Sequence, residues 1–148
     1  MVDTLSAKRR SYLMGRVRQR NTAPERLLRH ELHRLGLRYR LHTKSLPGTP
    51  DLVFRKHATV VFVHGCFWHG HACRAGRLPS TNTAYWTAKI AGNRERDARK
   101  EAHLRREGWR VFVVWECTIK GASLTSTAKA LATAIRDTSQ SERARVRG

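Results

Sequence analysis

The chain has 148 residues, enough for one domain with a core of ordinary size and too few for two independent enzymes. Its 30 Lys and Arg against 11 Asp and Glu give a formal net charge of +19 at pH 7, and residues 21–135 keep most of that excess. Such a charge favours a polyanionic partner, most often nucleic acid, with an anionic membrane surface as the next candidate. The 40% hydrophobic content excludes wholesale disorder. The start lacks a signal-peptide pattern and no apolar run approaches the roughly 18 residues of a membrane span, which predicts a cytoplasmic protein with no membrane partner.

The first half of the chain predicts one helix and three strands after a basic arm. Residues 22–25 (TAPE) are a capping box, and leucines at helical spacing follow them up to Gly36, which predicts a helix. Residues 37–42 alternate apolar with basic or histidine side chains, the pattern of a strand with one solvated face. Residues 51–54 and the nearly continuous apolar run 59–64 predict two more strands, the second of them central in a sheet.

The second half predicts a long loop, two helices and one strand. Residues 65–82 contain glycines, histidines and cysteines in a loop too long to be a simple connector, so we expect a function there. A charged helix is predicted over 83–107, a buried strand over 109–116 and an amphipathic helix over 124–136. The order αβββαβα predicts an α/β fold in which helices flank a small mixed sheet. The predicted organisation has three parts: a basic N-terminal arm (1–21), one folded domain (22–136) and a basic C-terminal tail (137–148).

Three cysteines and a histidine have the chemistry of a metal site. The odd cysteine count and the expected reducing compartment argue against a closed disulfide framework. The loop carries the pattern C-x4-H-x-C and a further cysteine ends the last predicted strand, so four soft or borderline ligands could surround a tetrahedral Zn2+. The predicted structural zinc ligands are Cys66, His71, Cys73 and Cys117. His64 and His69 are alternative ligands within reach, and three unrelated buried thiols are the alternative without a metal.

Asp51 is the acidic residue best placed to bind a metal ion. It opens a strand, and the next strand leads to His64 and then His69 in the adjoining loop. A carboxylate beside a backbone carbonyl is a hard oxygen site of the kind that Mg2+ accepts, and a histidine near it could deprotonate water. In-line phosphodiester hydrolysis needs both a metal site and a base of this kind. The alternatives are a turn-capping role for Asp51 and a purely capping-box role for Glu25.

Aromatic side chains occur in the same loop. Phe67 and Trp68 are adjacent there, and at least one of the two rings is hard to bury fully. On a cationic protein such rings could stack on bases or wedge between base pairs. Trp86 at a helix start and Met14 in the basic arm are weaker candidates of the same type. The alternative is that Phe67 and Trp68 cover the metal loop.

Four sequence blocks occur in order, PGTPDLVF, VVFVHGCFWHGHAC, YWTAKIAGNRERD and GWRVFVVWEC. Because of these blocks, residues 47–117 resemble the very short patch repair (Vsr) DNA mismatch endonuclease family. The capping box extends the resemblance to residue 22. The resemblance implies a restriction-endonuclease-like fold with a zinc-bound loop. It also implies a bacterial, DNA-associated enzyme that requires Mg2+ and nicks duplex DNA on the 5′ side of the mispaired T, at T:G mismatches left by deamination of 5-methylcytosine.

The resemblance further implies a role for each candidate residue. Asp51 would bind Mg2+ together with the backbone carbonyl of Val63, His69 would be the general base, and His64 and Glu25 would support the waters around the metal. The strand that ends at His64 holds no lysine, unlike the usual restriction-enzyme pattern, so a histidine base is required. The implied zinc ligands are those named above, and the implied DNA wedge consists of Phe67, Trp68, Trp86 and Met14.

Two classes of function follow from these residues, an enzyme and a binding protein. The first is a monomeric, strand-specific mismatch endonuclease with catalytic Mg2+ and structural Zn2+, whose partner is duplex DNA with a T:G mismatch. General mismatch-repair proteins are further candidate partners. The alternative is a zinc-stabilised, non-catalytic DNA-binding protein, and a third hypothesis is a nuclease of the same fold that acts on other DNA structures. Asp51 favours an enzyme, because a pure binder would not place a carboxylate where it repels phosphate.

Overall fold

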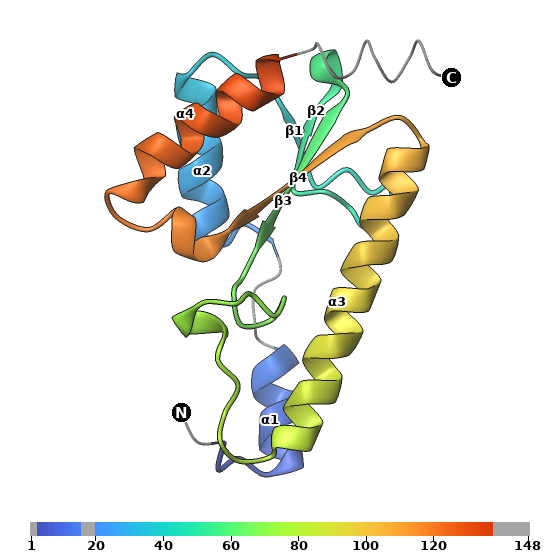
Figure 1. Ribbon diagram of the computed structural model, residues 1–148, viewed down its shortest axis with the longest axis vertical. Coiled ribbons are helices and arrows are strands. Elements are labelled where there is room, and N and C mark those ends of the chain that lie inside the picture. Colours follow the sequence, from blue (N-terminus) through green and yellow to red (C-terminus); the bar gives the residue numbers. More distant parts are fainter. Residues whose placement is uncertain (1–2, 16–19, 138–148) are drawn as a thin grey trace.

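A four-stranded mixed sheet forms the centre of the computed structural model, which describes residues 3–15 and 20–137 (Figure 1). The strands lie in the order β1 (Arg40–Leu41), β2 (Leu52–Phe54), β3 (Thr59–His64) and β4 (Arg110–Trp115). The first two pairings are antiparallel, whereas β3 and β4 are parallel. The chain therefore leaves β3 and β4 at the same end of the sheet, where His64 pairs with Trp115.

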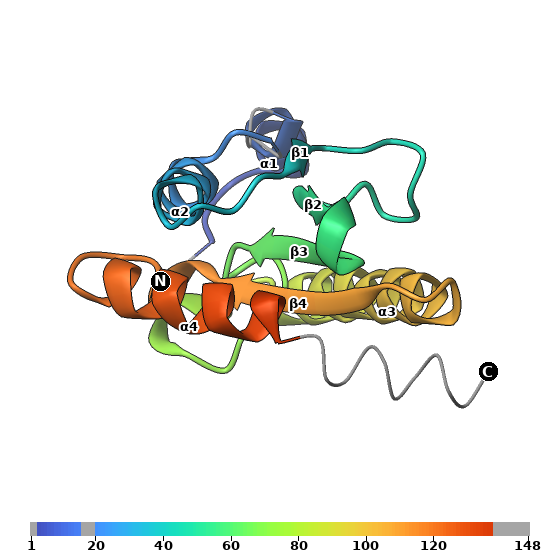
Figure 2. The ribbon, with the colours of Figure 1, turned by 90° about the horizontal axis from the view of Figure 1, so that it is seen from above.

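Helices cover both faces of this sheet. α2 (Ala23–Arg34) and α4 (Ser123–Arg136) pack against each other on one face, and α3 (Thr83–Arg106) lies along the other (Figure 2). The arrangement confirms the predicted mixed sheet flanked by helices. Within the described residues, no helix combines the length and the apolar character that a bilayer crossing requires.

The core consists of two apolar clusters, one on each face of the sheet. Side chains of β2 and β3 alternate between them, because successive residues of a strand point to opposite faces. Leu52 and Val61 belong to the cluster with α2 and α4, whereas Val53 and Val60 pack with Leu104 of α3. The run 59–64 contributes to both clusters, which explains its nearly continuous apolar sequence.

The strand β1 is shorter than the predicted strand over 37–42. Its partner β2 ends at Phe54, which lies opposite Tyr39, and a 3-10 turn (Arg55–His57) follows, so the residues before Tyr39 have no strand to pair with. Tyr39 instead turns its hydroxyl toward α2 and donates a hydrogen bond to the carbonyl of Arg29 at 2.8 Å. The alternating pattern is therefore present, but only part of it forms a ladder.

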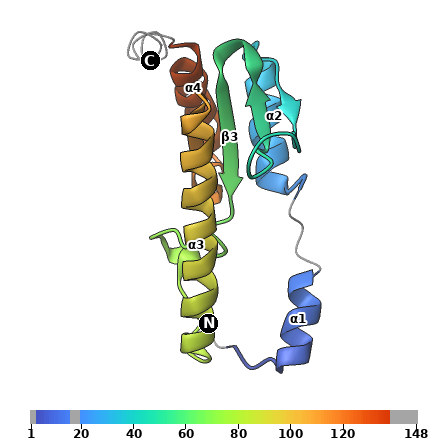
Figure 3. The ribbon, with the colours of Figure 1, turned by 90° about the vertical axis from the view of Figure 1, so that its right-hand side faces the viewer.

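An additional helix precedes the predicted elements, so the full order is ααβββαβα. α1 (Ala7–Gly15) lies in the N-terminal arm, beside the first turns of α3 (Figure 3). Its clearest local signal is Ser6, whose Oγ accepts a hydrogen bond from the Arg9 amide at 3.2 Å. Met14 belongs to α1, but its side chain lies outside the described part of the chain. The arm's residues 16–19 and the tail's residues 138–148 also lie outside it.

Candidate active site and metal centre

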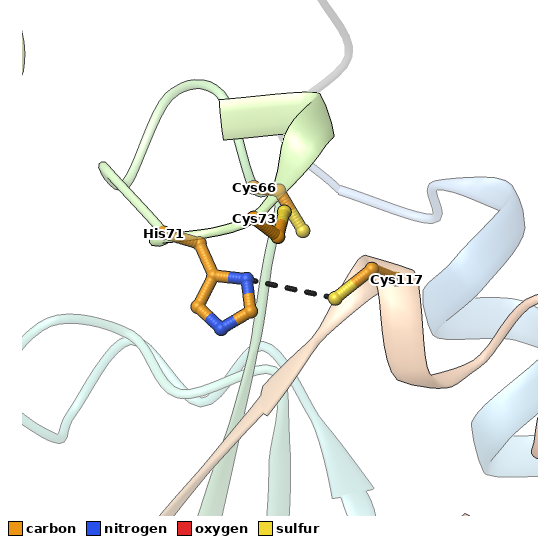
Figure 4. Close-up of side chains that lie close together, drawn as sticks. All are labelled: Cys66, His71, Cys73 and Cys117. Carbon is orange, nitrogen blue, oxygen red and sulfur yellow. Dashed lines mark hydrogen bonds between the residues drawn. The ribbon is translucent and has the colours of Figure 1, made fainter. Parts of the chain in front are cut away.

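Three cysteines and one histidine converge beyond the parallel strands (Figure 4). Cys66, His71 and Cys73 lie in the loop after β3, and Cys117 lies in the 3-10 turn after β4. Their ligand atoms all lie within 4.8 Å of one another, and Cys117 Sγ is 3.5 Å from His71 Nδ1. The parallel pairing of β3 and β4 causes this convergence, because both segments leave the same end of the sheet. The structure thus places His71 in the set, rather than either of the two histidines that precede it.

The donor chemistry of this thiol cluster fits a metal ion. All three cysteines are free. Burial raises the pKa of the Cys66 thiol to about 12, so it stays protonated without a cation beside it. Burial acts the same way on Cys73, but hydrogen bonds from His71 and from backbone amides outweigh it and lower the pKa of Cys73 to about 7. A bound cation would stabilise the thiolates, and the stacking of His71 on Trp115, with ring centroids 4.2 Å apart, holds the imidazole in place.

Asp51 lies directly before β2 and faces β3. Its Oδ2 accepts a hydrogen bond from the Val63 amide at 2.7 Å. Burial raises the pKa of Asp51 to about 6; the Val63 amide opposes this rise, and the nearby carboxylate of Glu25 adds to it. A buried carboxylate of this kind gains stability from any cation that binds next to it.

Glu25 is 1% exposed. It lies in the first turn of α2, and its carboxylate is close to that of Asp51. Its Oε2 accepts a hydrogen bond at 3.0 Å from the amide of Asn21, the residue before the N-cap Thr22, rather than from the amide of Thr22 as in a standard capping box. Its Oε1 lies 2.6 Å from His42 Nε2 and 3.3 Å from Arg29 Nη1. The ligand atoms of Glu25, His42 and Asp51 lie within 4.8 Å of one another, so the three residues could hold a metal. The half of the capping box made by Thr22 is present, because its Oγ1 accepts a hydrogen bond from the Glu25 amide at 3.4 Å, and it does not account for the whole environment of Glu25.

His64, His69 and Asp97 form a third polar group. The two imidazole rings stack with centroids 3.8 Å apart and 5° between their planes. His69 Nδ1 lies 2.6 Å from Asp97 Oδ2. Burial, with a contribution from His69, lowers the pKa of His64 to about 4. Burial acts to raise the pKa of Asp97, but its hydrogen bond to His69 outweighs that effect and leaves the pKa below its ordinary value.

Sequence reasoning missed two members of these groups, His42 and Asp97. Asp97 lies in a run of mixed charges on α3, which is typical of a solvated helix face. His42 offered a weak signal, because it ends the alternating segment next to β1. Its amide donates a hydrogen bond to the Asp51 carbonyl at 3.2 Å, so the pairing of β1 with β2 brings it beside Asp51.

One tight turn separates the histidine group from the thiol cluster. His69 and His71 are only two positions apart, yet one contacts Asp97 and the other Cys117. Gly70 between them has φ +68°, and a Cβ there would approach Ile90 Cγ2 of α3 to 2.8 Å. Glycine is therefore required both by the backbone conformation and by the close approach of α3.

Members of the acidic and histidine groups line one open cleft of about 870 Å3, and Glu25 lies behind it. Asp51, His64, His69 and Asp97 all face it, together with Trp68. The predicted meeting of Asp51 with the two histidines therefore occurs. Four basic side chains share the lining: Arg20, Lys89, Arg96 and Lys100. Cations at the cleft attract phosphate, and carboxylates with imidazoles supply the ligands and the base that phosphodiester hydrolysis uses.

An aromatic cluster adjoins the cleft. Phe67 lies edge-on to Trp68 and to Trp86, with ring centroids 4.9 Å and 5.3 Å apart, and Trp68 and Trp86 are 6.1 Å apart. Trp86 is buried, and its indole N–H donates a hydrogen bond to Asp3 at 2.8 Å. Phe67 and Trp68 are half-buried. The rings of Phe67 and Trp68 thus pack on Trp86 of α3 and still expose part of their surface to solvent.

Comparison with known proteins places this chain in a family. A family model described as DNA mismatch endonuclease Vsr matches residues 2–75. The type II nicking enzyme V.XorIIP of Xanthomonas oryzae pv. oryzae is 59% identical over 119 residues, 80% of this chain and 88% of the relative. DNA mismatch endonuclease Vsr of Escherichia coli is 43% identical over 121 residues, 82% of this chain and 78% of the relative. The chain belongs to the Vsr family.

Membership in the Vsr family makes the chain a DNA mismatch endonuclease, a hydrolase that acts in DNA repair. The predicted enzyme class and family are confirmed, and the non-catalytic DNA binder is set aside. A nuclease of this family is expected to use a metal cofactor. The described residues offer three groups with the ligand chemistry for metal binding: the thiol cluster, the His64 group and the Asp51 group.

Proposed function

We propose that this Vsr-family enzyme uses Mg2+ to nick one strand of duplex DNA on the 5′ side of the mispaired T in a T:G mismatch. The observation that carries the proposal is the shared cleft, which brings the buried Asp51, the His69–Asp97 pair and the aromatic Trp68 to one cavity. Groups suited to hydrolysis and a ring suited to contacting bases thus face the same space. The proposal includes a restriction-endonuclease-like fold, which agrees with the mixed sheet and its flanking helices.

Asp51 is the proposed Mg2+ ligand, with the backbone carbonyl of Val63 as a second oxygen donor. Hard oxygen donors are the ligands that Mg2+ prefers. When bound, Mg2+ would polarise the phosphoryl oxygen and stabilise the leaving oxygen. Glu25 and His64 are proposed to orient the waters around the ion, and the contact with His42 fixes the carboxylate of Glu25 for that role.

His69 is the proposed general base. Its Nδ1 is occupied by the contact with Asp97, so Nε2 is the atom left to take a proton from the attacking water. The Asp97 carboxylate fixes this tautomer and stabilises the imidazolium that forms. His64, whose pKa is lowered to about 4, stays neutral beside His69 and does not oppose the new charge.

Cys66, His71, Cys73 and Cys117 are the proposed ligands of a structural Zn2+. Four protein donors fill a tetrahedral shell and leave no open position for chemistry. The ion would fix the loop that carries His69, which has few apolar residues to hold its own shape.

Phe67, Trp68 and Trp86 are the proposed wedge, with Met14 from the arm as a fourth member. Inserting apolar side chains into a duplex costs the stacking energy of the opened step, and that cost is lowest at a mismatched pair. A wedge beside the catalytic groups would therefore favour nicking at a mismatch over nicking at a paired site.

A nicking assay on matched duplexes tests the proposal. Three duplexes differ only in one position, which is T:G, T:A or C:G, and each strand carries its own fluorescent label. With Mg2+ we expect a nick only in the T strand of the T:G duplex, 5′ of the T, and none without divalent cation. Asp51→Asn should still bind the T:G duplex without cutting it. A nick in both strands, or equal nicking of the paired duplexes, would overturn the assignment of substrate.

A further inference from the structure

We propose that Asp3 is a positioning residue for mismatch recognition, because its carboxylate ties the N-terminal arm to Trp86 of the aromatic cluster. The inference rests on the proposed role of that cluster as a DNA wedge. It concerns a residue in the part of the chain where the sequence predicts only a basic arm.

The Asp3 side chain is 4% exposed and accepts hydrogen bonds at both oxygens. Oδ2 accepts from Trp86 Nε1 at 2.8 Å, from Arg10 Nε at 2.9 Å and from Asn82 Nδ2 at 3.2 Å. Oδ1 accepts from the Leu5 amide at 3.1 Å. Burial acts to raise the pKa of Asp3, but these hydrogen bonds outweigh it and lower the pKa below its ordinary value. Asp3 therefore carries its charge at neutral pH, as the anion its donors require.

The backbone of Asp3 is held to the start of α3 as well. Its carbonyl accepts hydrogen bonds from Thr81 Oγ1 at 2.6 Å and from Asn82 Nδ2 at 3.2 Å. Asn82 occupies the N-cap position of α3, where an asparagine usually accepts a hydrogen bond from the helix, but here its side chain makes no capping bond. The amide instead donates to Asp3, so a helix cap is given up in favour of the contact with the arm.

Arg10 completes the junction from the side of α1. It is 8% exposed, unlike Arg9 next to it, which is exposed. Its guanidinium lies over the ring of Tyr85 at 4.7 Å and near that of Trp86 at 5.8 Å. A buried arginine is stable only when it is paired, and Asp3 supplies the paired anion at 2.8 Å.

Asp3 thus links two parts of the proposed DNA-binding surface that are 83 positions apart in sequence. Its contacts fix the indole of Trp86 by the ring N–H, and Trp86 in turn packs against Phe67 and Trp68. Without the Asp3 carboxylate, Trp86 and Arg10 would lose their shared acceptor, and both the arm and the aromatic cluster would sample other positions. The loss should weaken engagement of the mismatch while the groups proposed for hydrolysis keep their own contacts.

The test compares Asp3→Asn, Trp86→Phe and the double variant, in protein with its native N-terminus and any tag at the C-terminus. Asparagine keeps the size of the side chain but loses the charge, and phenylalanine keeps a ring but loses the N–H donor. We expect Asp3→Asn to raise KM for a T:G duplex roughly tenfold, the scale of one charge-assisted hydrogen bond, with kcat changed less than about twofold. The double variant should be no weaker than the weaker single variant, because both weaken the same contact between Asp3 and Trp86. Glu95→Gln, which removes one charge from an exposed position on α3, should leave KM unchanged.

A measurement without DNA separates this inference from the proposed function. Hydrogen–deuterium exchange should become faster over residues 3–15 in Asp3→Asn and should stay as in the wild type over β3 and β4. Unchanged exchange in the arm, or additive losses in the double variant, would overturn the role of Asp3. A wild-type protein that nicks no T:G duplex would overturn the proposed substrate, and the exchange experiment would still decide whether Asp3 anchors the arm.

Discussion

Asp51 and Asp97 face the same cleft, yet their pKa values shift in opposite directions. Burial raises the pKa of Asp51, whereas the contact with His69 leaves that of Asp97 below its ordinary value. Two carboxylates whose pKa values shift in opposite directions suit different chemical tasks. Asp97 is a permanent counter-charge for an imidazole, and Asp51 is a carboxylate whose charged form becomes stable when a cation arrives.

Asp51→Asn should stabilise the protein in buffer free of divalent cations. The folded state holds the pKa of Asp51 at about 6, above the ordinary 3.8, so it binds this proton more tightly than the unfolded chain does. Wild-type stability should therefore fall as the pH rises through that interval and remain lower above it, and the variant should lack this loss. Urea denaturation at pH 7 should show a difference of about 1–3 kcal/mol. Identical pH dependence in the two proteins would refute the raised pKa.

Asp97→Asn should reduce kcat on a T:G duplex by about 10²-fold or more while KM changes little, because the amide no longer stabilises a protonated His69 or enforces its tautomer. Combining it with His69→Ala should add almost nothing to the loss caused by His69→Ala alone. Glu101→Gln, one helical turn further along α3, removes a carboxylate that pairs with Arg105 and is the matched control. Equal losses in Asp97→Asn and Glu101→Gln would point to a general charge effect instead.

At the scale of elements, prediction from the sequence succeeded where the signal was local. The run 59–64 is a strand because almost every residue is apolar and β-branched or aromatic, and the TAPE capping box starts α2 at Ala23. The proximity of Cys66, His71, Cys73 and Cys117 was also predictable, since three of these four residues lie in one loop. The helix α1, the short β1 and the partners His42 and Asp97 depend on contacts with segments distant in sequence. Local patterns, such as Ser6 before α1 and the alternation up to His42, signal them only weakly.

Removing one thiol tests whether the loop after β3 depends on the proposed Zn2+. Cys73→Ala should release the ion, speed hydrogen exchange over residues 65–76, and abolish both nicking and mismatch binding, because this segment carries His69 and the adjacent aromatic rings. Atomic absorption measures the bound metal, and exchange measures the loop. His103→Ala, at an exposed site on α3, is the control. A Cys73→Ala protein that retains a full equivalent of zinc would show that Cys73 is not a ligand.

At the scale of the whole molecule, the charge of +19 predicted a nucleic-acid partner, and the family confirms that the chain acts on DNA. The composition could not show where the charge would act. In the fold, Lys89, Arg96 and Lys100 of α3 come to the cleft, while α4 lies on the opposite face of the sheet. Topology therefore decides which of the many cations line the cleft.

Binding to duplex DNA should weaken steeply with salt, because each phosphate contact releases counterions. Six to ten contacts correspond to a slope of about −5 to −9 in a plot of log affinity against log salt concentration. Lys89→Gln should reduce that slope by about 0.9 on matched and mismatched duplexes alike. Lys129→Gln, exposed on α4, should not change it. Fluorescence anisotropy across a salt series measures the slope for the wild type and the two variants. Equal slopes for all three proteins would show that Lys89 of α3 does not contact DNA phosphates.

The turn at Gly70 has a consequence for the enzyme under oxidising conditions. It joins the thiol cluster and the histidine that contacts Asp97 within a few residues, so neither can move alone. If the proposed Zn2+ is bound, peroxide that converts Cys66 or Cys73 to a sulfenic acid or a disulfide would eject it and release the turn, and His69 would lose its alignment without being touched by the oxidant. Strand cleavage would then be silenced by damage at a site that takes no direct part in the proposed reaction, and reduction of the thiols followed by rebinding of Zn2+ would restore it.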